Sequence, residues 1–233
     1  MFIGGKNVVK EVINNNQKIL KAYIWDKFDD KDMISELVKR EINIKYVPKF
    51  ELDKIENINH QGIILDVPDF QYSSLKELLT SNKPFIVMLD HVEDPHNFGA
   101  IIRTCEAAGV DGIIIPKDRS VSVNSTVMKT SSGALSNMKI CMVTNLNATI
   151  SELKDKGLWI VGTDIDGKQG YSEINYDFPV CLIIGSEGFG MSRIIKESCD
   201  YIVKIPMKGK VNSLNASVAA GILIYKIFEK RNW

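Results

Sequence analysis

The sequence has few of the residues that mark disulfide-rich or metal-binding proteins. It contains four cysteines and three histidines in 233 residues, and no two cysteines form a Cys-x-x-Cys pair. Free, buried thiols are therefore expected, and neither a disulfide framework nor a zinc site is indicated. His91 and His96 share a loop with Asp90 and Asp94, but their spacing matches no helical pair of metal ligands, so we expect no metal there.

Long apolar runs and a net charge are also missing. No stretch stays apolar over the roughly 20 residues of a membrane-spanning helix, and residues 1–6 lack the apolar core of a signal peptide. A cytoplasmic protein without membrane contact is therefore expected. The 29 basic residues equal the 29 acidic ones, which argues against a large nucleic-acid-binding face. Any RNA contact would have to be local, and its candidates are the loop residues Arg119, Lys208 and Lys210.

Two α/β domains are predicted from the hydrophobic patterns. Residues 1–68 combine short strands with intervening helices, which is typical of a small α/β unit. Residues 69–83 are mostly polar and predict a linker, and residues 84–233 form the second domain. The three strands of the first domain are expected at 19–25, 44–47 and 62–67.

The second domain repeats a strand-and-helix pattern. The apolar run 85–90, the helix 100–108 with Gly109 as its C-terminal cap, and the strand 112–115 form a βαβ unit, which implies a parallel sheet. A long helix is expected over 124–138. Further strands are expected at 139–143, 158–162, 180–184 and 201–207. About six strands with helices between them predict a parallel α/β sheet.

Two strand-to-helix corners follow one another near the C-terminus, and such corners hold the ligand sites of α/β sheets. The first, residues 185–190, has the order Gly-x-x-Gly-x-Gly, which matches neither the dinucleotide fingerprint nor the phosphate loop. Glu187 within it would repel a diphosphate at a helix N-terminus. A neutral or cationic ligand that needs close backbone approach fits better, and S-adenosylmethionine, with its sulfonium charge and unphosphorylated ribose, is one such molecule. A tight turn with an exposed acid is the alternative.

The second corner opens from strand 201–207 into a polar stretch, 208–215, and a helix that begins with small residues. Asn97 lies at the mouth of strand 85–90, and Arg103 lies in the second turn of the helix that follows. Both are expected to face the same carboxyl edge of the sheet.

Three blocks of residues around these corners form a recognisable set. They are Asp94-Pro95-His96-Asn97-Phe98-Gly99-Ala100-Ile101-Ile102-Arg103, Ile184-Gly185-Ser186-Glu187-Gly188-Phe189-Gly190-Met191, and Ile205-Pro206-Met207 with Ser213-Leu214-Asn215-Ala216-Ser217. In order and spacing they resemble the SpoU (TrmH-type) family of the SPOUT class of RNA 2′-O-ribose methyltransferases. Two further segments, Pro116-Lys117-Asp118-Arg119-Ser120 and Asn59-His60-Gln61-Gly62-Ile63, resemble the branch that methylates a 23S rRNA guanosine.

This resemblance implies a fold, a cofactor and a site. The N-terminal domain would be an RNA-binding domain of ribosomal-protein-like fold, and the last strands and helix would form a trefoil knot whose loops bind S-adenosylmethionine. The protein would be a homodimer with active sites near the interface. Four residues match the family's functional polar positions and are the catalytic candidates: Asn97, Arg103, Glu187 and Asn215. The cofactor would be held near Thr163, Gly185, Ile205, Met207, Ser213 and Leu214.

Methyl transfer to a ribose hydroxyl requires alignment of that hydroxyl with the sulfur–methyl bond and removal of its proton. The family account gives proton removal to the arginine that matches Arg103. A guanidinium keeps its proton above about pH 12, so we expect Arg103 chiefly to clamp a phosphate and to lower the pKa of the hydroxyl. The alternatives are a tRNA ribose or base nitrogen as acceptor, and a noncatalytic RNA-binding protein on the same fold.

Overall fold

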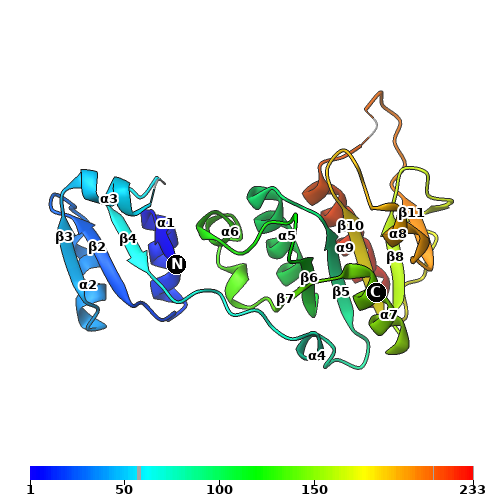
Figure 1. Cartoon of the computed structure of the whole chain (residues 1–233), viewed down its shortest axis with the longest axis horizontal. Coiled ribbons are helices and arrows are strands. Elements are labelled where there is room, and N and C mark those ends of the chain that lie inside the picture. Colours follow the sequence, from blue (N-terminus) through cyan, green and yellow to red (C-terminus); the bar gives the residue numbers. More distant parts are fainter. Residues whose placement is uncertain (57–58, 212, 233) are drawn as a thin grey trace.

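Two α/β domains follow one another along the chain in the computed structural model, which describes residues 1–56, 59–211 and 213–232 (Figure 1). Trp233, with which the predicted second domain ends, lies outside the described residues. Among the described residues, none of the helices combines the length and apolarity that a bilayer crossing requires.

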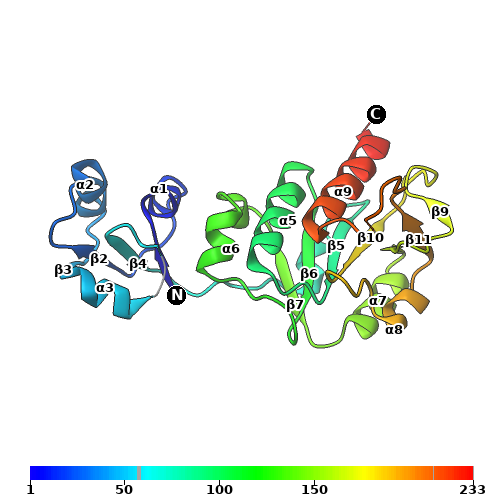
Figure 2. The same ribbon diagram turned by 90° about the horizontal axis from the view of Figure 1, so that it is seen from above.

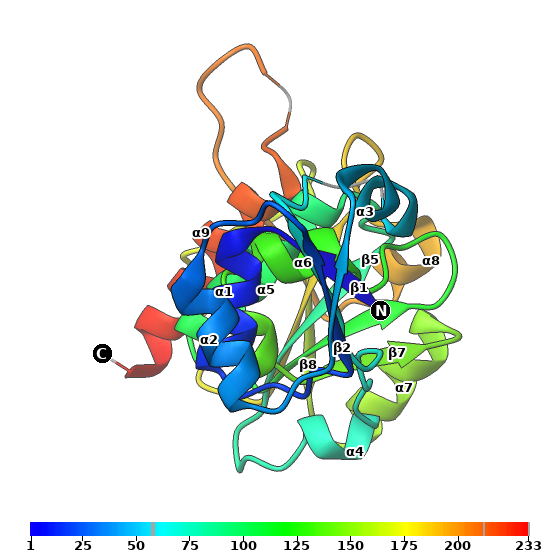
Figure 3. The same cartoon turned by 90° about the vertical axis from the view of Figure 1, so that its left-hand side faces the viewer.

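The first domain is a four-stranded sheet with helices on both faces (Figure 3). α1 and α2 bury one face, where Val9 and Leu37 are fully covered, and α3 packs on the other. The strand order is β1-β4-β2-β3. The elements are β1 (Phe2–Gly4), α1 (Lys6–Asn14), β2 (Lys21–Trp25), α2 (Lys31–Lys39), β3 (Ile44–Val47), α3 (Lys49–Ile55) and β4 (Ile63–Asp66). The prediction of three strands missed β1, because three residues are too few to show an alternating pattern.

The second domain is built on a seven-stranded sheet in the order β7-β6-β5-β10-β8-β11-β9. Every neighbouring pair is parallel, which confirms the predicted parallel α/β sheet. The strands are β5 (Phe85–Asp90), β6 (Gly112–Pro116), β7 (Ile140–Val143), β8 (Trp159–Thr163), β9 (Gln169–Gly170), β10 (Val180–Gly185) and β11 (Tyr201–Lys204). β11 ends before the predicted Met207, and Pro206 has no N–H to continue the ladder.

Helices cover both faces of this sheet and make three layers (Figure 2). α5, α6 and α9 bury one face, and α4, α7 and α8 bury the other. The strands pair in parallel with both faces covered, so their residues are apolar almost without interruption. The helices are α4 (Leu75–Leu78), α5 (Pro95–Ala107), α6 (Ser125–Thr130), α7 (Leu146–Asp155), α8 (Arg193–Glu197) and α9 (Ala216–Asn232).

The helix predicted over 124–138 is broken in the structure. α6 ends at Thr130, and a short 3-10 helix occupies Ala134–Ser136. Between them Ser132 and Gly133 have φ angles of 50° and 81°. A right-handed helix cannot continue through positive φ angles, and a single serine and glycine in an otherwise helical pattern did not reveal this break.

Much of the segment predicted as a linker packs on the second domain. Ser74 donates its backbone N–H and its hydroxyl to the Glu77 carboxylate at the start of α4, both at 2.6 Å. Leu78 is fully buried in the core under α7, and the Tyr72 hydroxyl accepts a hydrogen bond from the backbone N–H of Val123 at 3.0 Å.

Truncation of Leu78 tests this packing. We expect Leu78→Ala to destabilise the protein by about 2–5 kcal/mol, because the buried isobutyl group leaves a cavity. Lys76→Ala, on the exposed side of the same helix, should change stability by less than about 0.5 kcal/mol. Chemical denaturation followed by circular dichroism compares the two variants. Equal midpoints for both would show that α4 is not part of the folded core.

Candidate functional site

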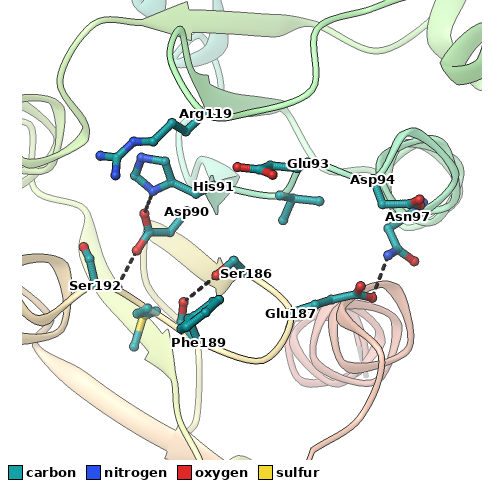
Figure 4. A pocket seen from close by; sticks show the side chains of 13 residues that line it. Asp90, His91, Glu93, Asp94, Asn97, Arg119, Ser186, Glu187, Phe189 and Ser192 are labelled. Carbon is teal, nitrogen blue, oxygen red and sulfur yellow. Dashed lines mark hydrogen bonds and ion pairs between the residues drawn. The ribbon is translucent and has the colours of Figure 1, made fainter.

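Two loops lie side by side because the strands that carry them are paired. β10 pairs with β5, and Gly185 stands opposite Asp90 at their carboxyl ends. Asp90 is 1% exposed, and its carboxylate accepts a hydrogen bond from the backbone N–H of Ser192 at 2.7 Å. The other carboxylate oxygen lies 2.5 Å from Nδ1 of His91 (Figure 4). A buried carboxylate therefore joins the end of β5 to the segment that follows the glycine turn.

The glycine turn, residues 186–190, is closed by its own backbone. Ser186 and Gly190 exchange two N–H···O hydrogen bonds of 3.0 Å. A Cβ atom at Gly185 would lie 2.3 Å from the carbonyl carbon of Gly190, so only glycine permits this approach. Gly188 and Gly190 have φ angles of 79° and 67°, which also favour glycine. The glycines thus form a tight turn, and that turn is also a wall between two pockets.

The first pocket, here called the corner pocket, has a volume of about 450 Å³ and lies between the glycine turn and the segment from β11 to α9. It brings together all six residues predicted to hold a cofactor: Thr163, Gly185, Ile205, Met207, Ser213 and Leu214. The described residues that line it include no lysine, arginine or histidine, whereas Asp164 and Glu187 supply carboxylates. The corner pocket therefore suits a ligand that is uncharged or cationic and has no phosphate.

Asp164 is ionised at the rim of the corner pocket. Partial burial acts to raise its pKa, but a hydrogen bond from Lys196 outweighs burial and lowers the pKa. The two charged groups are 2.9 Å apart. A carboxylate held in its charged form favours a positive ligand nearby.

Three predicted catalytic residues meet in one hydrogen-bonded group, here called the amide cluster. Oε1 of Glu187 accepts from Nδ2 of Asn97 at 2.7 Å and from Nδ2 of Asn215 at 2.8 Å. Nδ2 of Asn215 also donates to Oδ1 of Asn97 at 2.9 Å. Asn97 is held in the first turn of α5, where its N–H donates to Asp94 at 2.8 Å. Asn215 precedes α9, and its Oδ1 accepts from the N–H of Ser217. The amide cluster thus ties the first turn of α5 to the glycine turn and to the residue that precedes α9.

The second pocket, here called the side pocket, lies on the other side of the glycine turn (Figure 4). Its volume is about 490 Å³. It shares four residues with the corner pocket: Ser186, Glu187, Phe189 and Gly190. Arg119, predicted to contact RNA, lines it together with His91, Glu93 and Asn97. Two ligands, one in each pocket, would therefore lie next to each other at the glycine turn and the amide cluster.

Arg103 is not brought to the amide cluster within one chain. It lines a separate hollow with Glu11 and Asn14 of α1 and Gly133. Six helical residues turn the side chain by about 240° and move it by about 9 Å along the axis, so Asn97 and Arg103 point in different directions from α5. Lys208 and Lys210 are exposed on residues 205–211, which follow β11 and extend away from the body of the domain (Figures 1 and 3).

The cysteines offer no reactive thiol near these pockets. Cys105, Cys141 and Cys181 are buried, and Cys199 is half-buried. Burial raises the pKa of the Cys199 thiol to about 12, so it is protonated at neutral pH. Within residues 1–56, 59–211 and 213–232, no three histidine, cysteine, aspartate or glutamate side chains gather as metal ligands.

Asp90, Glu93 and Ser192 are site residues that the sequence alone did not single out. The signal for Asp90 was its place as the one charged residue at the end of a six-residue apolar strand. Its partner, the backbone N–H of Ser192, is 102 residues away in the chain, and no local pattern connects the two positions.

Comparison with known proteins agrees with this geometry. The profile of the SpoU rRNA Methylase family matches residues 84–225. The profile of the RNA 2′-O ribose methyltransferase substrate-binding domain matches residues 2–73. The chain is 41% identical over 239 residues to a Bacillus subtilis (strain 168) protein named as a TrmH family tRNA/rRNA methyltransferase, and the match covers 99% of this chain and 96% of that protein.

Two solved structures share the fold over both domains. The SpoU methyltransferase AviRb from Streptomyces viridochromogenes, in complex with the cofactor AdoMet, superposes with a TM-score of 0.82 and 21% identity over 99% of this chain and 89% of its own. An AdoMet-bound rRNA methyltransferase from Sinorhizobium meliloti gives a TM-score of 0.78 and 25% identity over 98% and 86%. The chain belongs to the SpoU (TrmH-type) family and is an RNA 2′-O-ribose methyltransferase.

Proposed function

We propose that the protein methylates the 2′-hydroxyl of a guanosine in 23S rRNA, uses S-adenosylmethionine bound in the corner pocket, and acts as a homodimer in the cytoplasm. The observation that carries this proposal is the arrangement of two pockets on either side of one glycine turn, with the amide cluster at the boundary. One pocket can hold a methyl donor while the other receives the acceptor. The segment 116–120 supports the choice of 23S rRNA through its resemblance to that branch.

The corner pocket fits S-adenosylmethionine chemically. Its walls carry carboxylates and no cationic side chain among the described residues, which suits a sulfonium and an unphosphorylated ribose. Gly185, Ile205 and Leu214 line the pocket at the glycine turn and the second corner, where their main-chain groups would hold the cofactor, and the small side chains of Ala216 and Ala219 line it from α9. When bound, the cofactor supplies an electrophilic methyl group on sulfur.

The amide cluster would position the acceptor ribose. Glu187 lines both pockets, and Asn97 lines the side pocket. One oxygen of Glu187 accepts hydrogen bonds from both amides. These bonds set the distance between the glycine turn and the first turn of α5. That spacing would align the 2′-oxygen with the sulfur–methyl bond, so that a new oxygen–carbon bond forms as the sulfur–carbon bond breaks. The hydroxyl proton leaves to phosphate or water.

Arg103 would clamp a phosphate of the acceptor and favour loss of the hydroxyl proton. Since one chain places Arg103 in a different hollow from the amide cluster, a second copy of the chain would have to supply it. Exposed apolar side chains on α9 support a homodimer. One face of α9 packs on the core. On its other face Val218 and Tyr225 are 50% and 49% exposed, and a second copy of the chain would cover them.

RNA would be held outside the pockets by basic side chains and by the first domain. Arg119, Lys208 and Lys210 are exposed on loops of the second domain, and the match of residues 2–73 to a substrate-binding domain supports RNA contact by the first. We further propose that the last strands and α9 form a trefoil knot. In support, β10 lies between β5 and β8, and α9 returns to pack on α5 and β10.

A direct test of the function is methyl transfer from tritiated S-adenosylmethionine to rRNA and tRNA isolated from a strain that lacks the gene. We expect label in 23S rRNA, and mass mapping of the same RNA should find one ribose that lacks its methyl group. Label in tRNA alone would replace the proposed substrate with a tRNA ribose. Failure to bind S-adenosylmethionine in isothermal titration would contradict the proposal and favour a noncatalytic RNA-binding role.

Removal of the Glu187 carboxylate should disable the site without unfolding the protein. In Glu187→Ala the amides of Asn97 and Asn215 lose their common acceptor, so we expect methyl transfer to fall about 10- to 100-fold. Glu152→Ala, on the surface of α7, is the matched control. Thermal melting within a few degrees of the wild type is expected for both. Global unfolding of Glu187→Ala would assign the residue a structural role instead.

Replacement of Arg103 separates its geometry from its charge. Arg103→Lys keeps the charge but loses the planar pair of donors, so we expect turnover to fall at least about 10-fold with unchanged affinity for S-adenosylmethionine. Arg193→Lys, at an exposed position on α8, should keep full turnover. Nearly full turnover by Arg103→Lys would remove both the clamp and the proton-acceptor roles.

A further inference from the structure

Glu93 and Arg119 stand out among the charged groups of the side pocket because neither has a partner among the described residues. Asp90 is bonded to His91 and to the N–H of Ser192. Asp94 accepts from the N–H of Asn97, and Glu187 belongs to the amide cluster. In the part of the chain that the structure describes, neither Glu93 nor Arg119 makes a hydrogen bond or an ion pair. The side pocket thus presents one free carboxylate and one free guanidinium.

These two opposite charges line the same pocket but do not join. Glu93, His91 and Arg119 all line the side pocket, and in Figure 4 the Glu93 carboxylate lies apart from the His91 ring and the Arg119 side chain. The Asp90 carboxylate holds that ring through Nδ1. The side pocket thus carries a free carboxylate and a free guanidinium at separate positions on its lining, which suits a planar group with donors on one edge and acceptors on another.

The backbone around this pocket is strained where these side chains begin. His91 and Arg119 have φ angles of 60° and 51°, in the left-handed region that residues other than glycine seldom adopt. Such conformations persist where the surrounding structure enforces them, and they gather at ligand sites. Both strained residues line the side pocket, which is consistent with side chains held ready for a ligand.

Guanine carries the matching groups. Its N1–H and N2–H donors lie together and can pair with one carboxylate, while its O6 and N7 acceptors lie together and can pair with one guanidinium. Uracil offers a single N–H between two carbonyls, and adenine and cytosine each have one amino group beside a ring acceptor. Phe189, which is 94% exposed at the turn shared by both pockets, offers a face on which a base can stack.

We propose that the side pocket binds the base of the acceptor nucleotide and selects guanine, with Glu93 accepting from N1–H and N2–H and Arg119 donating to O6 and N7. This inference rests on the proposed function, because a base in the side pocket places its ribose at the glycine turn beside Glu187 and Asn97. The pocket volume of about 490 Å³ falls within the usual range for small-ligand sites, roughly 300–1,000 Å³.

The test follows which nucleoside receives the methyl group. The wild-type protein is incubated with tritiated S-adenosylmethionine and rRNA from a strain that lacks the gene, and the RNA is digested to nucleosides and separated. We expect label only in 2′-O-methylguanosine. Glu93→Gln should lower that label about 10- to 100-fold, because a bidentate base contact is lost, and Arg119→Lys should lower it at least several-fold. Asp155→Asn, at an exposed position at the end of α7, is the matched control and should match the wild type.

Affinity for S-adenosylmethionine, measured by isothermal titration, should be unchanged in Glu93→Gln and Arg119→Lys. Label in another 2′-O-methylnucleoside would overturn both guanine selection and the proposed guanosine acceptor, while the RNA ribose methyltransferase activity stands. Label within twofold of the wild type for both variants would overturn the roles of Glu93 and Arg119. If the wild-type protein labels no RNA and binds no S-adenosylmethionine, the proposed function itself fails and this inference fails with it.

Discussion

The parallel pairing of β10 with β5 is the constraint on which the site depends. β10 crosses into the middle of the sheet, so that Gly185 stands opposite Asp90 and the two following loops share one edge. A buried carboxylate is costly unless its oxygens are satisfied, and Asp90 finds its partners in both loops. The strand order thus places the glycine turn, and the Asp90 contacts hold it there.

Charge is distributed unequally on the two sides of the glycine turn. The corner pocket has carboxylates and no cation among its described lining residues, whereas the side pocket has both signs. This difference suits a positively charged methyl donor on one side and a polar, hydrogen-bonding acceptor on the other. Glu187 lines both pockets, and its two amide partners keep that carboxylate in one place.

The first domain contacts the second at the hollow that contains Arg103. Glu11 of α1 lines this hollow, and Gln17 donates a hydrogen bond to the Ser136 hydroxyl across the domains. Partial burial raises the pKa of Glu11, while the charge of Arg103 acts to lower it. The surface that would clamp an RNA phosphate is thus next to the domain that matches a substrate-binding family.

The sequence by itself determined the parallel α/β sheet, the position of the glycine turn and the family, because periodicity and short motifs are local properties of a chain. It also listed Asn97, Glu187 and Asn215, but their common hydrogen bonds join residues as far apart as 118 positions. Only the tertiary structure decided that Arg103 lies in another hollow and that the Asp90 carboxylate accepts from the N–H of Ser192. It also decided that Glu93 and Arg119 line the same side pocket. Those relations depend on strand order and helix rotation, which the pattern of neighbouring residues does not encode.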